Sequence, residues 1–255
     1  MTSLSPAQAG QPADRRAMPT GPFVKIYGLQ RSGTNFLEWL IRKNFAKARV
    51  LVDETGWKHG PVPDAVDWRG LDWSDPEWSP WEKRAFAARR RNRLGPALAD
   101  LRAAVERGDL RTCMIAKDPY SWWVSYARYR GRPSSPVEPR AVRLWVDLNR
   151  HWRGYADANE RHTLFLRYED LLAAPSEGLS AIGVLLGLPP SRPAHPCCRQ
   201  AIGPIGARPT PVLFDRDYYR DKRYLDALAA RDFDIINAHL PTDLLAMLGY
   251  EVRHG

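Results

Sequence analysis

The chain has 255 residues, of which 44% are hydrophobic and 26% charged, and its formal net charge is +9 at pH 7. This composition is ordinary for a soluble protein, and the length predicts one large domain with a buried core. Since no apolar run reaches the roughly 18 residues of a membrane helix, we expect no membrane span. The positive charge favours anionic ligands. No nucleic-acid-binding motif is present, so nucleic acid is not an expected partner.

Three cysteines are too few and too unevenly spaced for a disulfide framework. Cys197 and Cys198 are adjacent, and Cys113 lies in a predicted buried strand. This usage is typical of the reducing cytoplasm, so we expect a cytoplasmic location. The oligomeric state is left open by the sequence.

The first 22 residues differ in composition from the rest of the chain. Residues 1–22 are rich in Pro, Ala, Gln and Ser and lack the apolar core of a signal peptide. We therefore predict a disordered arm over residues 1–22 and a single domain over residues 23–255.

The stretch after this arm reads as strand, tight loop and helix. Residues 23–27 are apolar and typical of a buried strand, Gly28 and Gly33 bracket a short polar loop, and apolar positions recur at helical spacing from Thr34 onward. A glycine-bounded loop that leads into a helix presents backbone N–H groups and the positive end of the helix dipole. This stretch therefore predicts an anion site.

The same loop has the Gly-x-x-x-x-Gly spacing of the nucleotide-triphosphate loop, but not its next two residues. Thr34 occupies the position of the lysine, Asn35 that of the magnesium-binding hydroxyl, and the basic group has moved to Arg31. We therefore expect a phosphate to be held through N–H groups, with no metal ion and with a transferable group other than a γ-phosphoryl.

A region rich in tryptophan and arginine follows a second short strand at residues 50–52. Residues 56–95 contain five tryptophans between positions 57 and 81, several prolines and the run Arg89 to Arg91. One interpretation is a lid that binds an acceptor against aromatic faces; the other is a loop that its tryptophans pack onto the domain. The arginine run is typical of a solvated helix face.

The next elements predict a parallel crossover and a second anion contact. A helix from Pro96 to Gly108 precedes an apolar strand over residues 111–116. Lys117 directly follows this strand, at the end where α/β sheets place ligands, and Ser125 lies on the helix after it. Together Lys117 and Ser125 could hold a second phosphate; a surface lysine and a helical serine are the alternative.

The remaining chain alternates in the same way. We predict a helix over 139–160, a strand over 163–167, a helix over 175–188, a proline-rich loop over 189–212 and a helical region over 214–250 that is broken at Pro241. This order predicts an α/β fold with a central, mostly parallel sheet flanked by helices.

Four blocks resemble the sulfotransferases that use 3′-phosphoadenosine 5′-phosphosulfate (PAPS). Residues 31–36 (Arg-Ser-Gly-Thr-Asn-Phe) resemble the 5′-phosphosulfate loop, and Lys117-Asp118-Pro119 with Ser125 resembles the 3′-phosphate motif. Residues 167–171 (Arg-Tyr-Glu-Asp-Leu) resemble a block after a core strand, and residues 244–251 the tail of carbohydrate-type members. The family has an arginine where this chain has Lys117 and a hydroxyl residue where it has Asn35, and its late Arg-Lys-Gly loop has no match.

The resemblance implies a P-loop-like three-layer fold, PAPS as donor and its bisphosphate (PAP) as product. It implies the donor-binding residues Arg31, Ser32, Gly33, Thr34, Asn35, Phe36, Lys117, Ser125 and Tyr168, with Arg220, Lys222 and Arg223 as basic candidates near the 3′-phosphate. The implied acceptor is a hydroxyl on a saccharide or glycoconjugate, with other small molecules left open.

The resemblance also implies a catalytic group made of Arg31, Lys58 and His59. His59 is the expected base, because it lies shortly after a strand end and an imidazole titrates near neutral pH. A surface histidine is the alternative reading, and Glu54 competes for the same role.

Two other functions stay open at this point. A kinase on a similar fold would need the absent lysine and a magnesium carboxylate, for which Asp118 is the obvious candidate. A non-catalytic module that binds polyanions would account for the net charge and the arginine runs, and its binding would not depend on Arg31.

Overall fold

The computed structural model describes residues 21–51, 55–64, 98–196 and 216–255. Within them four strands form one parallel sheet in the order β2-β1-β3-β4. The strands are β1 (Phe23–Tyr27), β2 (Arg49–Leu51), β3 (Arg111–Ala116) and β4 (Thr163–Arg167). The α/β fold with a parallel sheet between helices, predicted from the element order, is confirmed and has the form of a P-loop-like three-layer fold.

Helices follow each strand and also make up the C-terminal part of the chain. They are α1 (Thr34–Asn44), α3 (Leu98–Glu106), α4 (Pro119–Tyr129), α5 (Pro139–Ala158), α6 (Tyr168–Ala173), α7 (Pro175–Leu186), α8 (Asp217–Arg220), the 3-10 helix η3 (Arg223–Ala227), α9 (Ala230–His239) and α10 (Thr242–Leu248). None of these helices is long and apolar enough to cross a membrane.

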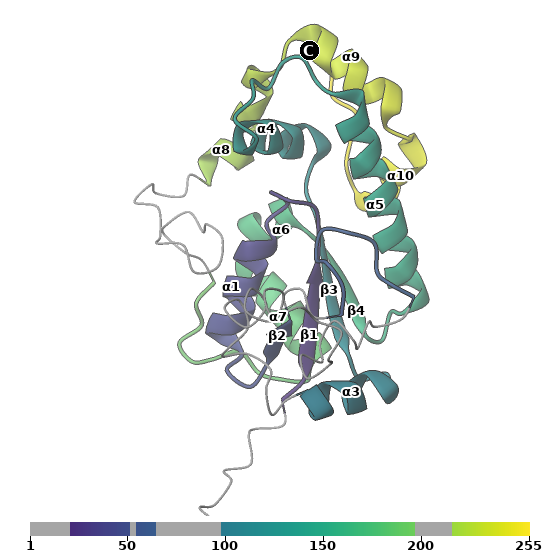
Figure 1. Ribbon diagram of the computed structural model, residues 1–255. Helices are drawn as coiled ribbons and strands as arrows, with labels where there is room; N and C mark the ends of the chain where they lie inside the picture. Colours follow the sequence, from purple (N-terminus) through teal and green to yellow (C-terminus); the bar gives the residue numbers. More distant parts are fainter. Residues whose placement is uncertain (1–20, 52–54, 65–97, 197–215) are drawn as a thin grey trace, which may run out of the picture.

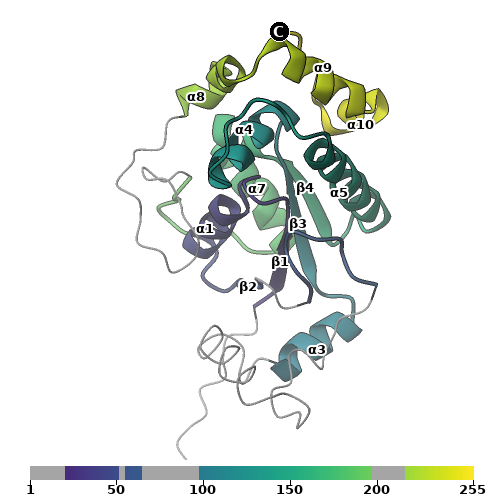
Figure 2. The same cartoon turned by 45° about the horizontal axis from the view of Figure 1, so that its top comes forward.

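The strand sequences alternate between two hydrophobic layers, one on each face of the sheet. Val24 and Ile26 pack with α1 and α7 on one face, whereas Tyr27 and Met114 pack with α4, α5 and the C-terminal helices on the other. Figure 2 shows α1 and α7 on one side of the strands and α5 on the other. Both faces of the parallel sheet are thereby covered, which explains why its central strands β1 and β3 are almost entirely buried.

Local sequence signals set several helix ends. Pro119, Pro139 and Pro175 occupy the first turns of α4, α5 and α7, where a missing N–H costs nothing. Gly187 and Gly249 end α7 and α10 in the left-handed conformation. Because these signals depend only on neighbouring residues, the ends of these helices can be predicted directly from the sequence.

The strand order indicates where a ligand would bind. The chain runs from β2 at one edge, past β1, to β3 on the other side, so the connections after β1 and β3 leave in opposite directions. In open α/β sheets ligands bind at the carboxyl ends of the strands at such a switch point. Figure 1 shows α4 and α8 beyond this end of the sheet and α3 beyond the opposite end.

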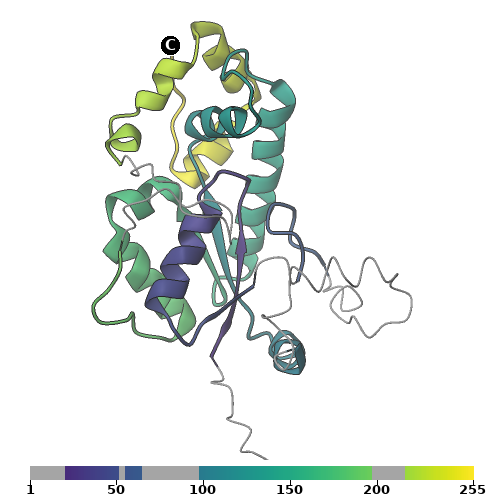
Figure 3. The ribbon, with the colours of Figure 1, turned by 60° about the vertical axis from the view of Figure 1, so that its left-hand side comes forward.

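Most predicted elements are found at their predicted places, and the C-terminal region is the main difference. The helical region expected over 214–250 is divided into α8, η3, α9 and α10. Lys222 has a φ of 54°, which interrupts the helix after α8, and Pro241 separates α9 from α10. Figure 3 shows these C-terminal helices gathered at the same end of the molecule as α4.

Some predictions fall partly or wholly outside the described residues. These are the arm over residues 1–20, Glu54, residues 65–95 of the Trp/Arg-rich region and most of the proline-rich loop. Of the arm, Gly21 and Pro22 are described, and the Pro22 carbonyl accepts a hydrogen bond from the Arg49 N–H. The pairing of β1 with β2 is thus continued by one bond toward the N-terminus.

Candidate functional site

The loop between β1 and α1 is held by its own serine. Both the backbone N–H and the hydroxyl of Ser32 donate to the Leu29 carbonyl, at 3.0 and 2.8 Å. Arg31 and Gly33 have positive φ values of 71° and 98°, and Gly33 is the N-cap of α1. No side chain caps α1, and its first turn has no acidic residue. The positive end of the α1 dipole is therefore directed at the loop, and no acidic residue of the first turn of α1 balances it.

Two close approaches require glycine in this loop. A Cβ at Gly28 would lie 2.7 Å from the Ile115 carbonyl oxygen, and one at Gly33 would lie 2.3 Å from Cδ2 of Tyr168. The ring of Tyr168, the first residue of α6 after β4, therefore packs directly on the loop that follows β1. This contact joins two of the blocks that the sequence analysis selected.

Lys117 follows β3 and is 2% exposed. Its Nζ lies 4.8 Å from the centre of the Tyr168 ring and 4.6 Å from that of Tyr219, and it donates to the Tyr219 hydroxyl at 3.4 Å. Aromatic faces attract a cation but do not neutralise it. Among the described residues no carboxylate forms an ion pair with Lys117. A buried positive charge is therefore available next to the glycine loop.

The peptide group between Lys117 and Asp118 is bonded on both sides. The Trp145 indole N–H donates to the Lys117 carbonyl at 3.0 Å, and the Asp118 N–H donates to Oε1 of Glu169 at 3.1 Å. The Asp118 carboxylate accepts the N–H groups of Tyr120 and Ser121, so it caps α4. This use of Asp118 differs from that of the magnesium ligand that a kinase would need.

The carboxyl group of Asp118 in this turn and that of Glu169 in α6 both have raised pKa values. Burial raises the pKa of Asp118, and the cap bonds oppose this shift. Burial, together with the negative charge of Asp118, raises the pKa of Glu169 to about 7, and the charge of Lys117 opposes it. The charge near Lys117 therefore changes close to neutral pH.

The loop over residues 55–60 brings Lys58 and His59 to the carboxyl end of β1. The Gly28 N–H donates to the Lys58 carbonyl at 3.0 Å, and Nδ1 of His59 lies 2.6 Å from the Gly28 carbonyl oxygen. Since a carbonyl only accepts, Nδ1 carries a proton in this contact, and Nε2 is the nitrogen that carries the lone pair in the neutral form of the ring. The Lys58 ammonium donates to Oδ1 of Asn35 at 3.1 Å. Lys58, His59 and Asn35 thus lie around one strand end.

Buried groups fix this loop to the sheet and to α5. The Lys25 ammonium, fully buried in β1, donates to the Gly56 carbonyl, and the Tyr27 hydroxyl donates to the Thr55 carbonyl at 3.0 Å. The Trp152 indole N–H donates to the Gly60 carbonyl at 3.1 Å. The position of His59 is therefore determined by the sheet and α5 together.

The other predicted site residues lie at varying depths around the crevice. Arg31 is exposed, and its guanidinium lies 5.4 Å from the centre of the Tyr129 ring. Ser125 is half-buried on α4, and the described residues show no hydrogen bond between it and Lys117. Thr34 and Phe36 are buried in the first turn of α1. The exposed basic candidates are Arg220, which pairs with Asp217 and Asp221, Lys222, and Arg223, which lies over the Tyr218 ring.

Sequence reasoning missed three contributors to the site. Tyr219 covers the ammonium of Lys117, Trp145 and Glu169 bind the peptide group after it, and all three come from elements distant in the chain. Glu169 lies inside the Arg-Tyr-Glu-Asp-Leu block and could have been selected there. No local pattern distinguishes Tyr219 or Trp145 from other aromatic residues of the core.

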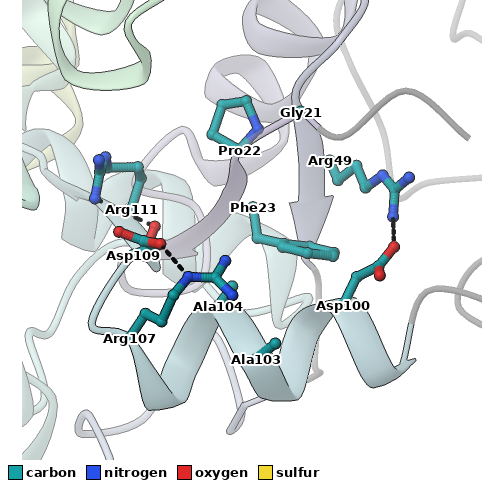
Figure 4. Close-up of a pocket in the computed structure, with 10 residues that line it drawn as sticks. All are labelled: Gly21, Pro22, Phe23, Arg49, Asp100, Ala103, Ala104, Arg107, Asp109 and Arg111. Atoms are coloured by element: carbon teal, nitrogen blue, oxygen red, sulfur yellow. Dashed lines mark hydrogen bonds and ion pairs between the residues drawn. The ribbon is translucent and has the colours of Figure 1, made fainter.

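The opposite end of the sheet has a cavity of about 470 Å³, lined by residues from β1, β2, β3 and α3 (Figure 4). Its arginines are already engaged. Arg49 pairs with Asp100 at 3.4 Å, and Arg107 pairs with Asp109 at 2.8 Å. Arg111 donates to the carbonyls of Leu185 and Asp109. We therefore place the candidate site at the carboxyl end of the strands and not at this cavity.

No protein-family model matches the chain, and no curated protein matches it significantly. Among the described residues no cluster of histidine, cysteine, aspartate and glutamate side chains is suited to a metal ion. The candidate site is therefore defined by the geometry of this chain alone: a glycine loop at a helix N-terminus, a buried lysine between tyrosine rings, and a histidine bonded to the first residue of the loop.

Proposed function

We propose that the protein is a sulfotransferase that moves a sulfuryl group from PAPS to an acceptor hydroxyl on a saccharide or glycoconjugate. The observation that carries the proposal is the position of Lys117. A buried ammonium without a carboxylate partner among the described residues lies next to a glycine loop that lacks the lysine and hydroxyl of the nucleotide-triphosphate loop. Two anion-binding elements on neighbouring strands fit a nucleotide with phosphates at both its 5′ and 3′ positions.

The residues of the crevice divide into two binding groups. Arg31 and the N–H groups of Gly33, Thr34 and Asn35 would bind the 5′-phosphosulfate at the N-terminus of α1. Lys117 would bind the 3′-phosphate, with Ser125 as a hydroxyl donor from α4. The resemblance puts Tyr168 next to the adenine, and its ring contacts both Gly33 and Lys117. Arg220, Lys222 and Arg223 are exposed on the α8–η3 segment, which also carries Tyr219.

The reaction needs a base and a site for negative charge. PAPS supplies a sulfuryl group whose bond to the 5′-phosphate oxygen breaks as a bond to the acceptor oxygen forms. In the neutral form of His59, Nε2 would take the proton of the acceptor hydroxyl. Arg31, Lys58 and the N–H groups of the loop would stabilise the charge on the departing phosphate oxygen, where one preorganised donor contributes on the order of 3 kcal/mol.

The surroundings of His59 support a flat acceptor. Trp57 is 58% exposed, and its ring meets that of His59 edge-on, with the ring centres 5.5 Å apart. An exposed indole next to the base gives an aromatic surface on which the face of a sugar can lie. The exposed indole therefore supports a saccharide acceptor over an acceptor that has no flat face.

The test is transfer of labelled sulfur from PAPS to a panel of saccharides without added metal. We expect label in the acceptor with the wild-type protein and strong loss with Arg31→Ala. Arg107→Ala removes an exposed arginine at the other end of the sheet and should leave transfer unchanged. Transfer of phosphate from ATP with magnesium, or no transfer together with binding that disappears in salt, would contradict the proposal.

A further inference from the structure

Glu169 forms a hydrogen bond with the turn that contains Lys117. Its Oε1 accepts the Asp118 N–H at 3.1 Å, while the indole of Trp145 donates to the carbonyl of the same peptide group at 3.0 Å. Hydrogen bonds on both sides restrain the rotation of this peptide plane, so residues of α5 and α6 help to set the direction in which the chain leaves β3 at Lys117. Truncation of either partner would release that plane.

The second oxygen of Glu169 connects the turn to the C-terminal segment. Oε2 accepts the Tyr250 hydroxyl at 3.0 Å. The centre of the Tyr250 ring lies 6.2 Å from the centre of the Trp145 ring. The Arg167 guanidinium lies 4.7 Å from the centre of the same Tyr250 ring. Residues from α5 and β4 therefore lie against the Tyr250 ring, whose hydroxyl binds the Glu169 carboxyl group of α6.

The proton of the carboxyl pair belongs on Glu169. Asp118 accepts two N–H groups at the N-terminus of α4 and a hydrogen bond from Tyr224, and it feels the charge of Arg253. Glu169 accepts the Asp118 N–H, its own backbone N–H and the Tyr250 hydroxyl, but burial and the negative charge of Asp118 both disfavour its anion. The pKa of Glu169 is accordingly raised to about 7. Among the described residues, the charged and titratable groups that act on this pair are Lys117, Tyr224, Tyr250 and Arg253, and the charge of Arg167 acts on Tyr250.

We propose that Glu169 is a positioning residue that fixes the Lys117–Asp118 peptide group and, through its proton, makes nucleotide binding at Lys117 depend on pH. This inference rests on the proposed function, because it takes the 3′-phosphate as the anion at Lys117. It assigns to Glu169 a role beyond packing: the neutral acid holds the turn without reducing the positive potential of Lys117.

The sign of the effect follows from linkage. A phosphate next to Lys117 brings negative charge close to Glu169 and favours its protonated form. Binding therefore takes up a proton when the pH is above the pKa of Glu169, so the affinity falls as the pH rises. Glutamine has the shape of the neutral acid: its amide oxygen accepts the Asp118 N–H, and its amide nitrogen donates to Tyr250. Glu169→Gln should therefore keep the low-pH affinity throughout.

The experiment is calorimetric titration of adenosine 3′,5′-bisphosphate into the full chain at several pH values between about 6 and about 8. The ratio of the wild-type Kd to that of Glu169→Gln cancels the ionisation of the ligand and of all other shared groups. We expect this ratio to rise by up to about tenfold over the range. Glu177→Gln makes the same substitution on the exposed surface of α7 and should give a constant ratio.

A second variant keeps the test independent of how well Glu169→Gln folds. Tyr250→Phe removes only the hydroxyl that donates to Glu169, so it should move the fall in affinity to higher pH. If the Glu169→Gln ratio changes by less than about twofold, or if Tyr250→Phe leaves the profile in place, the inference is wrong while the proposed function stands. If the wild-type protein does not bind the bisphosphate at any pH, the proposed function and the inference are both wrong.

Discussion

The two ends of the sheet both carry basic residues, but they use them differently. At the amino end, Arg49 and Arg107 each form an ion pair with an aspartate from the same region (Figure 4). At the carboxyl end, Lys117 lies between two tyrosine rings. Arg31 lies over a third tyrosine ring, that of Tyr129. Among the described residues, no carboxylate forms an ion pair with Lys117 or Arg31. The net charge of +9 is therefore a poor guide to where an anion binds; the partners of each cation are more informative.

The difference has a structural cause. In a sheet whose strands are all parallel, each following helix begins at the carboxyl end, so the positive ends of the helix dipoles gather there. Backbone N–H groups and buried cations at that end add to one another. The amino end lacks this contribution, and its arginines stabilise the junction of α3 with the sheet.

The largest expected effect is on the chemical step, where only the carboxyl end of the sheet should contribute. His59→Ala should lower kcat by about 10³-fold and leave the Kd for the bisphosphate nearly unchanged, because a general base acts on the acceptor and not on the donor. His162→Ala is the control at the amino end, where the imidazole contacts Arg111. Steady-state kinetics beside calorimetric titration separate the two quantities. Equal kcat values for the two variants would contradict the role of His59.

The next effect concerns stability and its dependence on pH. The pKa of Glu169 is about 7 in the folded protein and about 4.5 without perturbation. Between these values the folded state keeps a proton that the unfolded state has lost, so the free energy of unfolding falls as the pH rises. The fall amounts to at most about 3 kcal/mol. Urea denaturation at a series of pH values should show this slope in the wild type and not in Glu169→Gln; parallel curves would contradict it.

A matched pair of substitutions sharpens the contrast between the two ends. Lys117→Met and Arg107→Met each remove one cation and keep an unbranched side chain. Lys117→Met should weaken bisphosphate binding about 30-fold, about 2 kcal/mol, whereas Arg107→Met should not change it. Stability should not fall in Lys117→Met, since the substitution removes a buried charge. Similar losses of affinity in both variants would indicate binding by net charge alone.

The smallest effect is expected at the amino end itself. Arg107 lowers the pKa of Asp109 through a hydrogen bond, but both side chains are exposed. Asp109→Asn should leave the melting temperature within about 2 °C of the wild-type value at neutral pH. It should also leave bisphosphate binding unchanged. A larger shift in a thermal scan would show that the amino end contributes more to the fold than its exposed pairs suggest.

The strands and the glycine loop could be predicted from the sequence because their signals are local. The strands at residues 23–27, 111–116 and 163–167 lie where their apolar runs predict them. The positions of Gly28 and Gly33 already indicate a tight turn before a helix. Parallel pairing then follows from the helices between the strands, and the carboxyl ends of β1 and β3 become neighbours.

The partners of Lys117 could not be predicted, because they depend on contacts between distant segments. Trp145 and Tyr219 reach Lys117 from α5 and α8, and nothing in their own surroundings marks them. The division of the C-terminal region was missed for a related reason. Lys222 adopts a left-handed conformation that the sequence around it does not favour, and packing of η3 against α4 accompanies this break.

The ring of Tyr168 has a consequence for any quantitative study of the crevice. It occupies the space that a Cβ at Gly33 would need, at the N-terminus of α1, and lies against the ammonium of Lys117, so one side chain touches both halves of the site. Energetic contributions from the two halves should therefore be non-additive. A double-mutant cycle between the loop and Lys117 should report a coupling energy that disappears when the aromatic ring between them is removed.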